Sequence, residues 1–228
     1  MMDREPLVLS WSGGKDSALA LVRLREMPDV EVVGLMTTVT DGYDRISIHG
    51  VRRTLLHTQA AALGLPVLEV TLQPQSSNEA YERATADALA TVRERWPDVR
   101  RLAFGDIFLE DVRQYREALV GRLGFGSVVP LWGEAPDALA REVIGRGLRA
   151  RLVCVDTQQL DASFAGRAYD AALLADLPAG VDPCGERGEF HTFVSDGPGF
   201  REPVACGTGE VVLRDGRFAY CDLLPLHP

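Results

Sequence analysis

One short stretch near the start of the chain constrains the fold more than any other. The sequence SGGKDS at residues 12–17 stands between an apolar run at residues 7–9 and an Ala- and Leu-rich run at residues 18–24. The first run is short and follows Pro6, as a buried strand does, and the second run has apolar residues at helical spacing. The sequence therefore predicts a strand that turns sharply into a helix through two glycines.

Such a turn offers a site for an anion. The first N–H groups of a helix lack partners within it, and the helix dipole adds roughly half a positive charge there. Gly13 and Gly14 let the backbone approach the anion, and Lys15 adds a full charge. Ser12 and Ser17 add hydroxyl donors. The alternative interpretation is a glycine turn that merely starts a helix.

The glycine spacing separates this turn from the Walker P-loop, which reads G-x-x-x-x-G-K-[ST]. SGGKDS resembles instead the PP-loop of the ATP pyrophosphatases, which cleave ATP between the α and β phosphates. The resemblance implies that residues 12–17 hold the pyrophosphate end of ATP.

Composition argues against several classes of function. A net charge of −9 disfavours broad electrostatic binding to nucleic acid or to an anionic membrane, since both need surplus Lys and Arg. No apolar run approaches about 18 residues, so we expect no membrane span. The N-terminus has no signal-peptide core, and the four cysteines include no C-x-x-C pair. These features predict a cytoplasmic protein with reduced thiols.

Strands and helices alternate through the first 155 residues. The predicted strands lie at residues 7–9, 30–39, 67–72, 101–105, 127–129 and 150–155, with helical stretches between them. This alternation is typical of an α/β fold with a doubly wound parallel sheet, and the PP-loop resemblance implies the HUP, or adenine nucleotide α-hydrolase-like, type. We predict a PP-loop ATP-binding domain at 1–155 and a smaller α+β substrate-binding region at 156–228, ending in a hairpin around Asp215-Gly216.

Ligands of such sheets bind beyond the carboxyl ends of the strands, which selects further candidates. Asp106, after Gly105, could hold magnesium or a substrate amine, or it could cap a helix. Arg113 and Arg116 lie three apart on a predicted helix and could clamp a carboxylate or phosphate, or be ordinary surface arginines.

Two further residues lie close to predicted strand ends or helix starts. His49 precedes a helix and is a candidate phosphate contact or proton carrier. Trp132 follows a short strand and could pack against a ligand or fill the core.

A second informative stretch, GERGEFHTF, lies at residues 185–193. Glu186 and Glu189 are too costly to bury without a cation or hydrogen-bond donors. Phe190 and Phe193 alternate with polar positions and would hold the segment against a core. The alternative is a solvated loop.

The motifs, taken in order, resemble the diphthine–ammonia ligase (diphthamide synthase) family over roughly residues 7–200. They are SGGKDS, Ile48-His49-Gly50, Gly105-Asp106 with the arginines that follow, Leu131-Trp132, Leu160-Asp161 and G-E-x-G-E-F-H-T-F. The resemblance implies an AMP-forming ligase, in which ATP adenylates a substrate carboxylate and ammonia then forms the amide. The competing interpretations are a PP-loop pyrophosphatase acting on a different acid or small metabolite, and an ATP-binding protein without catalysis.

The family pattern usually reads Glu-Gly-Gly-Glu, and Arg187 replaces the first of its glycines, as in bacterial-type members. Bacteria lack elongation factor 2, on which diphthamide is made, so a bacterial-type member would amidate a different acid. The sequence leaves open the acceptor acid, ammonia as the nucleophile, and the oligomeric state, a homodimer included.

The resemblance also assigns roles to residues, with ATP and Mg²⁺ as cofactors. Residues expected at the nucleotide are Ser10, Ser12, Gly13, Gly14, Lys15, Asp16, Ser17, Met36, Thr37, His49, Gly105 and Asp106. Residues expected at the acceptor are Arg113, Arg116, Trp132, Asp161, Glu186, Glu189 and His191. The expected catalytic residues are Lys15, Asp16, Glu186 and Glu189, with Asp16 also a candidate magnesium ligand.

Lys15 carries the most specific of these expectations. Replacing it by Ala should lower turnover at least about 10-fold, because a charge-assisted contact is lost. We expect little effect on folding, because a lysine in a loop contributes little to a core.

Overall fold

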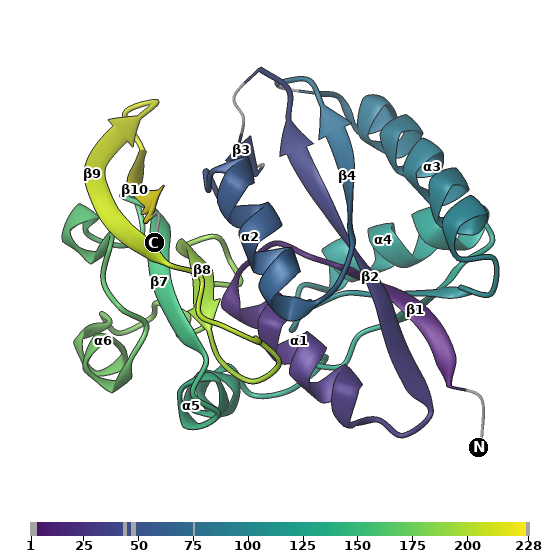
Figure 1. Ribbon diagram of the computed structural model, residues 1–228. Helices are drawn as coiled ribbons and strands as arrows, with labels where there is room; N and C mark the ends of the chain where they lie inside the picture. The colour runs from purple at the N-terminus through teal and green to yellow at the C-terminus, as the bar shows by residue number, and fades with distance from the viewer. Residues whose placement is uncertain (1–3, 43–44, 47–48, 75, 227–228) are drawn as a thin grey trace.

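The computed structural model describes residues 4–42, 45–46, 49–74 and 76–226, and strands and helices alternate through its first part (Figure 1). The elements of that part are β1 (Glu5–Ser10), α1 (Lys15–Glu26), β2 (Val30–Thr40), β3 (Arg45–Ile46), α2 (Arg53–Leu63), β4 (Val67–Leu72), α3 (Asn78–Arg95), β5 (Arg101–Ala103), α4 (Glu110–Arg122), β6 (Gly126–Val128) and α5 (Pro136–Gly145). The remaining elements are β7 (Arg149–Asp156), η1 (Ala162–Phe164), α6 (Ala171–Asp176), β8 (Phe190–Asp196), β9 (Cys206–Arg214) and β10 (Phe218–Pro225).

The first sheet is parallel apart from one short strand. Its parallel strands run in the order β4-β2-β1-β5-β6, and β3 adds antiparallel to the end of β2. Central β1 buries Leu7 and Leu9 on one face and Val8 on the other, because successive side chains of a strand alternate. A strand that is covered on both faces has a continuous apolar sequence, as residues 7–9 do. The predicted α/β class with a mostly parallel sheet is confirmed.

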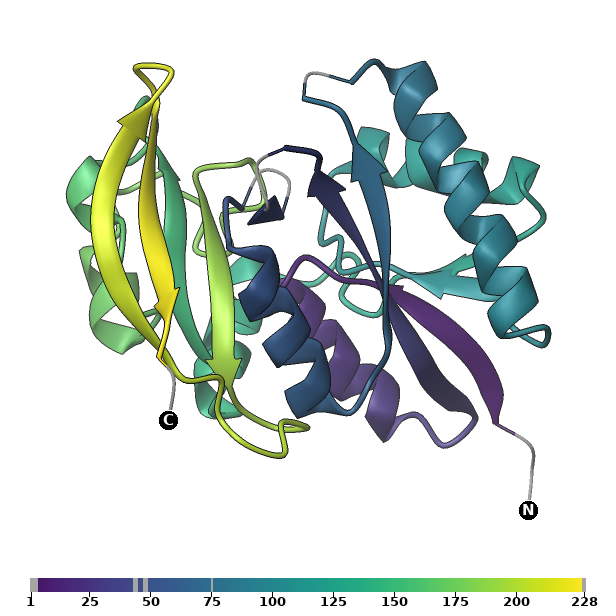
Figure 2. The same cartoon turned by 45° about the horizontal axis from the view of Figure 1, so that its top comes forward.

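Helices cover both faces of this sheet. Leu19 of α1 and Leu55 of α2 belong to the same hydrophobic cluster as Leu7. Leu89 of α3 and Val120 of α4 belong to the cluster on the opposite face. Figures 1 and 2 show the second sheet lying beyond α1 and α2, so these two helices are packed between two sheets.

The second sheet is antiparallel, in the order β8-β7-β10-β9. The prediction that residues 150–155 form the last strand of the first sheet is wrong, because β7 pairs with β8 and β10 instead. Its first residues alternate exposed Arg with buried Ala and Leu, which is the pattern of an antiparallel strand with one solvated face. The hairpin predicted around Asp215-Gly216 is present, with both residues at positive φ.

The two sheets share one hydrophobic cluster. It includes Leu9 and Leu35 of the first sheet and Phe193, Val194 and Ala219 of the second. The division of the chain at residue 155 therefore stays a prediction, since this core runs across it. Within the described residues, no helix is both long and apolar enough to cross a bilayer.

A buried glutamine joins the turn after β1 to β8. Gln59 of α2 is 0% exposed, and its side-chain oxygen accepts a hydrogen bond from Trp11 Nε1 at 2.7 Å. Its side-chain nitrogen donates to the backbone oxygens of Gly13 at 3.1 Å and Val194 at 2.6 Å. The Val194 N–H also donates to the Gly13 oxygen, at 2.9 Å. These bonds fix β8 directly against the glycine turn.

We predict that Gln59→Leu lowers the free energy of unfolding by about 2–4 kcal/mol. The substitution leaves the Trp11 indole N–H without its acceptor and removes a donor from two carbonyls, and an unsatisfied buried group costs about 1–3 kcal/mol. Urea denaturation followed by tryptophan fluorescence measures the loss. Thr58→Ala, on the exposed side of α2, is the matched control and should change stability by less than about 0.5 kcal/mol. Equal losses in the two variants would contradict the role assigned to Gln59.

Candidate active site

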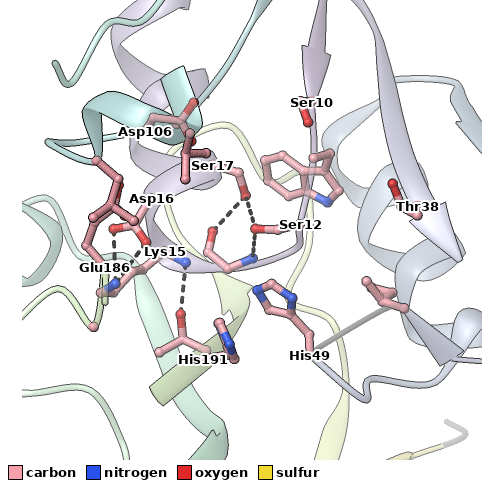
Figure 3. A pocket seen from close by; sticks show the side chains of 18 of the residues that line it. Ser10, Ser12, Lys15, Asp16, Ser17, Thr38, His49, Asp106, Glu186 and His191 are labelled. Carbon is pink, nitrogen blue, oxygen red and sulfur yellow. Dashed lines mark hydrogen bonds and ion pairs between the residues drawn. The ribbon is translucent and has the colours of Figure 1, made fainter. Parts of the chain in front are cut away.

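A cleft of about 560 Å³ lies at the carboxyl ends of β1 and β5 (Figure 3). Its walls come from the turn after β1, the end of β2, the segment after β5, α4, and residues 184–192 before and within β8. The predicted site residues that line it are Ser10, Ser12, Gly14, Lys15, Asp16, Ser17, His49, Gly105, Asp106, Arg116, Glu186 and His191. The topology thus brings the two informative stretches of the sequence to one cavity.

The turn after β1 has the geometry of an anion site. Gly13 has φ of +78°, and a Cβ on Gly14 would lie 3.1 Å from the Thr192 oxygen. The Ser12 and Ser17 hydroxyl oxygens are 3.2 Å apart, and Ser17 donates to the Gly14 oxygen at 2.9 Å. Because α1 begins at Lys15, the positive end of its dipole lies at the cleft.

The Lys15 side chain is buried, contrary to the expectation for a loop lysine. It is 2% exposed, and Nζ donates to the Asp16 carboxylate at 2.9 Å and to the Cys184 backbone oxygen. The rings of Tyr169 and Phe190 lie 5.5 Å from Nζ. Burial alone would lower the pKa of Lys15, but the neighbouring acidic groups raise it above its ordinary value. The premise that Lys15 is a loop lysine outside the core is therefore wrong, and its effect on folding stays a prediction.

Residues 182–189 form a loop held by two of its own carboxylates. Asp182 accepts hydrogen bonds from the N–H groups of Cys184 and Glu186, both at 2.9 Å. Glu189 accepts from the N–H groups of Asp182 at 3.1 Å and Arg187 at 3.0 Å. Glu189 is 2% exposed and does not line the cleft. It was predicted to face the acceptor, but its carboxylate holds the loop.

Glu186, by contrast, lines the cleft as predicted. Its Oε1 accepts a hydrogen bond from the Ile107 N–H at 2.9 Å, which ties the loop to the segment after β5. Burial, together with the charges of Asp16 and Asp106, raises the pKa of Glu186 to about 7 against the opposing effect of that hydrogen bond. Its carboxyl group therefore exchanges a proton near neutral pH.

Asp106 is a buried carboxylate at the same end of the cleft. One of its oxygens is paired with Arg116, and Oδ2 has no hydrogen-bond partner among the described residues. The N-cap of α4 is Leu109, so Asp106 does not cap that helix. A buried carboxylate oxygen without a donor beside a polar cavity is suited to a cation.

Two histidines lie together on the opposite side of the turn (Figure 3). The ring centroids of His49 and His191 are 4.6 Å apart, and both residues line the cleft. Burial, followed by the charges of His49 and Lys15, lowers the pKa of His191 to about 3, so its ring is neutral at neutral pH. Ile48, which precedes His49 in the predicted motif, lies outside the described residues.

Met36 and Thr37, predicted at the nucleotide, hold the backbone of Trp11. The Met36 oxygen accepts the Trp11 N–H at 2.8 Å, and the Thr37 hydroxyl donates to the Trp11 oxygen at 2.7 Å. Neither residue lines the cleft, whereas Thr38 does. The end of β2 therefore reaches the cavity one residue later than predicted.

Besides Glu189, three residues predicted at the acceptor lie outside the cleft, namely Arg113, Trp132 and Asp161. The Arg113 guanidinium lies 4.4 Å from the centroid of the Trp132 ring and donates to Glu117 at 2.8 Å. Asp161 is exposed and caps η1 by accepting the Ser163 N–H at 2.9 Å. Of the two predicted arginines only Arg116 reaches the cavity, although three-residue spacing placed both on one helix face.

Sequence reasoning missed several residues that shape the site. Tyr81 and Tyr115 line the cleft with their ring centroids 6.4 Å apart, and the Thr192 hydroxyl accepts the Lys15 N–H at 3.0 Å. The only sequence signal for Gln59 is a polar side chain on the apolar face of α2. Arg187, whose role the sequence left open, is exposed, and its guanidinium lies 5.3 Å from the centroid of the Phe108 ring.

Comparison with known proteins identifies two family domains. The diphthamide synthase N-terminal domain matches residues 6–127, and the diphthamide synthase C-terminal domain matches residues 135–217. The diphthine–ammonia ligase of Homo sapiens is 28% identical over an alignment of 247 positions, gaps included, which covers 95% of this chain and 90% of that protein. That of Danio rerio is 27% identical over 230 residues, covering 91% and 89%. That of Schizosaccharomyces pombe is 28% identical over 218 residues, covering 88% of this chain and 36% of that longer protein.

We predict that Lys15→Met lowers the free energy of unfolding by about 3 kcal/mol, because losing one partner of a buried ion pair leaves the other uncompensated. Urea denaturation measures the loss. The double variant Lys15→Met/Asp16→Asn should lose less than the sum of the two single variants, since neither charge is then left alone. A Lys15→Met variant as stable as the wild type would show that the buried ammonium contributes nothing to the fold.

The raised pKa of Glu186 predicts a pH dependence of stability. Between the ordinary pKa of glutamate and pH 7, the folded protein binds more protons than the unfolded chain. The protonated Glu186 side chain therefore adds its full contribution to the free energy of unfolding at acidic pH, and this contribution is lost as pH rises through about 7. Glu186→Gln should remove that part of the slope and melt higher than the wild type above pH 7, by about 2–4 °C per kcal/mol. Thermal melts across this pH range, with the exposed Glu79→Gln as control, test it. Identical slopes in the wild type and Glu186→Gln would refute it.

Proposed function

The chain belongs to the diphthamide synthase family, and on that premise we propose that it is an ATP-dependent ligase joining ammonia to a substrate carboxylate. The products are an amide, AMP and pyrophosphate. The observation that carries the proposal is the meeting of the turn at residues 12–17 with Glu186 and Asp106 in one cleft. An anion site and a set of carboxylates share this cavity, as the ligation of ammonia driven by ATP requires.

In this proposal the pyrophosphate end of ATP lies on the turn after β1. The N–H groups at the N-terminus of α1 supply uncharged donors to the departing pyrophosphate, and the Ser12 hydroxyl adds another when it turns away from Ser17. The Lys15 ammonium lies beneath the turn, where Asp16 and the Cys184 oxygen hold it, and its positive charge attracts the pyrophosphate from there. The nucleoside lies toward Thr38, at the end of β2.

Magnesium fits the carboxylates of the cleft wall that Asp106 and Glu186 form. Mg²⁺ usually takes one or two carboxylates together with phosphate oxygens and waters, so it needs no dense cluster of protein ligands. Within the described residues no three His, Cys, Asp or Glu side chains are arranged to hold a metal ion. Asp106, with its unpartnered Oδ2, is the residue we propose as ligand, because Lys15 already occupies the Asp16 carboxylate. When bound, the ion would neutralise phosphate charge.

Adenylation solves the chemical problem of amide formation. A carboxylate is a poor electrophile with no usable leaving group, and attack of its oxygen on the α-phosphate releases pyrophosphate and makes AMP the new leaving group. Ammonia then attacks the carbonyl carbon, the C–O bond to AMP breaks, and one proton is left for a base. The protein's contribution is to align the two reactants and to stabilise the departing charge.

Glu186 is the residue we propose for the ammonia step. Its carboxylate can hold ammonium by charge, and a base with a pKa of about 7 removes a proton more readily than an ordinary glutamate does. The Ile107 N–H fixes one of its oxygens, which leaves the other for the nitrogen. Arg116, paired with Asp106 at the cleft, is placed to receive an acidic acceptor.

The acceptor acid is proposed to differ from that of the relatives. Arg187 occupies a position where the family pattern usually has glycine, a feature that resembles the bacterial-type members. Its exposed guanidinium lies over Phe108, on the segment after β5 that also contacts Glu186. A positive charge beside the cleft favours an acceptor that carries negative charge beyond the reacting carboxylate.

We predict that the purified protein converts ATP to AMP and pyrophosphate when given ammonium, magnesium and a pool of small carboxylic acids. In this proposal ATP is cleaved between the α and β phosphates, so AMP should appear in step with the amide. Chromatographic quantification of the nucleotides measures this directly. ADP and phosphate as main products would contradict the assignment of the turn, and ATP binding without turnover for any acid would favour a non-catalytic ATP-binding protein.

Glu186→Gln separates the two half-reactions of this prediction. The variant should retain ATP binding, because Glu186 is not part of the turn, and should lose ammonium-dependent AMP release by about 10-fold or more, since general-base catalysis contributes about 10²–10⁴. The exposed Glu79→Gln is the comparison and should behave as the wild type. Undiminished amide formation by Glu186→Gln would remove this residue from the mechanism while leaving the ATP assignment intact.

A further inference from the structure

The second sheet ends in a long open edge. β9 spans nine residues and is the outermost strand in the order β8-β7-β10-β9 (Figure 2). Among the described strands it pairs with β10 alone, so its outer side presents backbone N–H and C=O groups. Proteins usually shorten, charge or cover such an edge, because it is a template for pairing with another strand.

The middle of β9 is also apolar and exposed. Val211, Val212 and Leu213 are 50%, 40% and 57% exposed. Val211 and Leu213 lie opposite Cys221 and Ala219 of β10, which are 4% and 1% exposed, so a buried face of the sheet ends abruptly at this strand. Three consecutive exposed apolar residues on an open edge predict that another strand covers them.

Two charges flank these apolar residues. Glu210 and Arg214 are exposed, and no ion pair joins either of them to another described residue. They lie four residues apart on an extended strand, about 13 Å, which is too far for them to pair with each other. Their signs are opposite and they are equally spaced about Val212.

We propose that β9 pairs antiparallel with β9 of a second copy of this chain, around a two-fold axis through Val212. In that register Glu210 of each copy lies opposite Arg214 of the other, and Val211 lies opposite Leu213. An axis through Val211 or Leu213 would place Glu210 opposite Val212 or Gly216, so only the Val212 register satisfies both charges. The two four-stranded sheets become one continuous sheet.

The charge pattern gives a direct test by reversal. Sedimentation equilibrium at low salt should show a dimer for the wild type. Arg214→Glu and Glu210→Arg each place like charges opposite one another twice, which should raise the dimer dissociation constant at least about 10-fold. Arg141→Glu, an exposed change on α5, is the control and should leave the constant unchanged.

Mixing the two reversed variants makes the test specific to this register. Glu210→Arg and Arg214→Glu should each be monomeric alone and should form a heterodimer together, because every cross-strand pair is then attractive. The double variant Glu210→Arg/Arg214→Glu should recover the homodimer. A misfolded variant could do neither, so the outcome does not depend on the stability of any single substitution.

The proposal is overturned by any of three results. A wild type that stays monomeric rejects the pairing of two copies through β9. A dimer insensitive to both reversals means that another surface holds it. Failure of the mixture and of the double variant to associate rejects the Val212 register. None of these outcomes affects the ligase proposal, because β9 lines no part of the cleft.

Discussion

The position of the C-terminal segment depends on a buried lysine. An ammonium group removed from water needs partners, and Lys15 finds them in Asp16, in the Cys184 oxygen and between two aromatic rings. Its backbone N–H is bound to Thr192. One residue at the start of α1 is thus satisfied largely by residues near the other end of the chain, which requires the loop at 182–189 to lie beneath the glycine turn.

This arrangement concentrates negative charge beside an anion site. Asp16, Asp106 and Glu186 line the same cleft as the glycine turn, and the charges of Asp16 and Asp106 disfavour ionisation of Glu186. The positive charges of Lys15 and Arg116 and the protonation of Glu186 reduce the repulsion between these carboxylates. A bound cation would relieve the rest, so occupancy by an anionic ligand and by a cation should be coupled.

Local patterns predicted the parallel sheet and the glycine turn because both are encoded by neighbouring residues. The apolar run of β1 and the SGGKDS spacing required no knowledge of distant contacts. Pairing of β7 depended on β8 and β10, which lie far along the chain, and alternation alone could not reveal it. For the same reason Glu186 and Glu189 looked equivalent in sequence, although the fold of their loop turns one into the cleft and the other under the backbone. Met36 and Thr37 do not line the cleft whereas Thr38 does, because a local sequence pattern does not show at which residue a strand reaches the edge of its sheet.

The core shared by the two sheets has a consequence for how a ligand enters. Domain closure around a nucleotide needs two bodies joined by a few compliant residues. Here the Val194 N–H donates a hydrogen bond to the Gly13 oxygen, and the Gln59 side chain donates to the backbone oxygens of both residues. One hydrophobic cluster also includes Leu9 of the first sheet and Ala219 of the second. These contacts tie the wall formed by the turn after β1 to the wall formed by β8, so this side of the cleft is assembled before a ligand arrives. A ligand bound here spends little of its binding energy on bringing these two segments together.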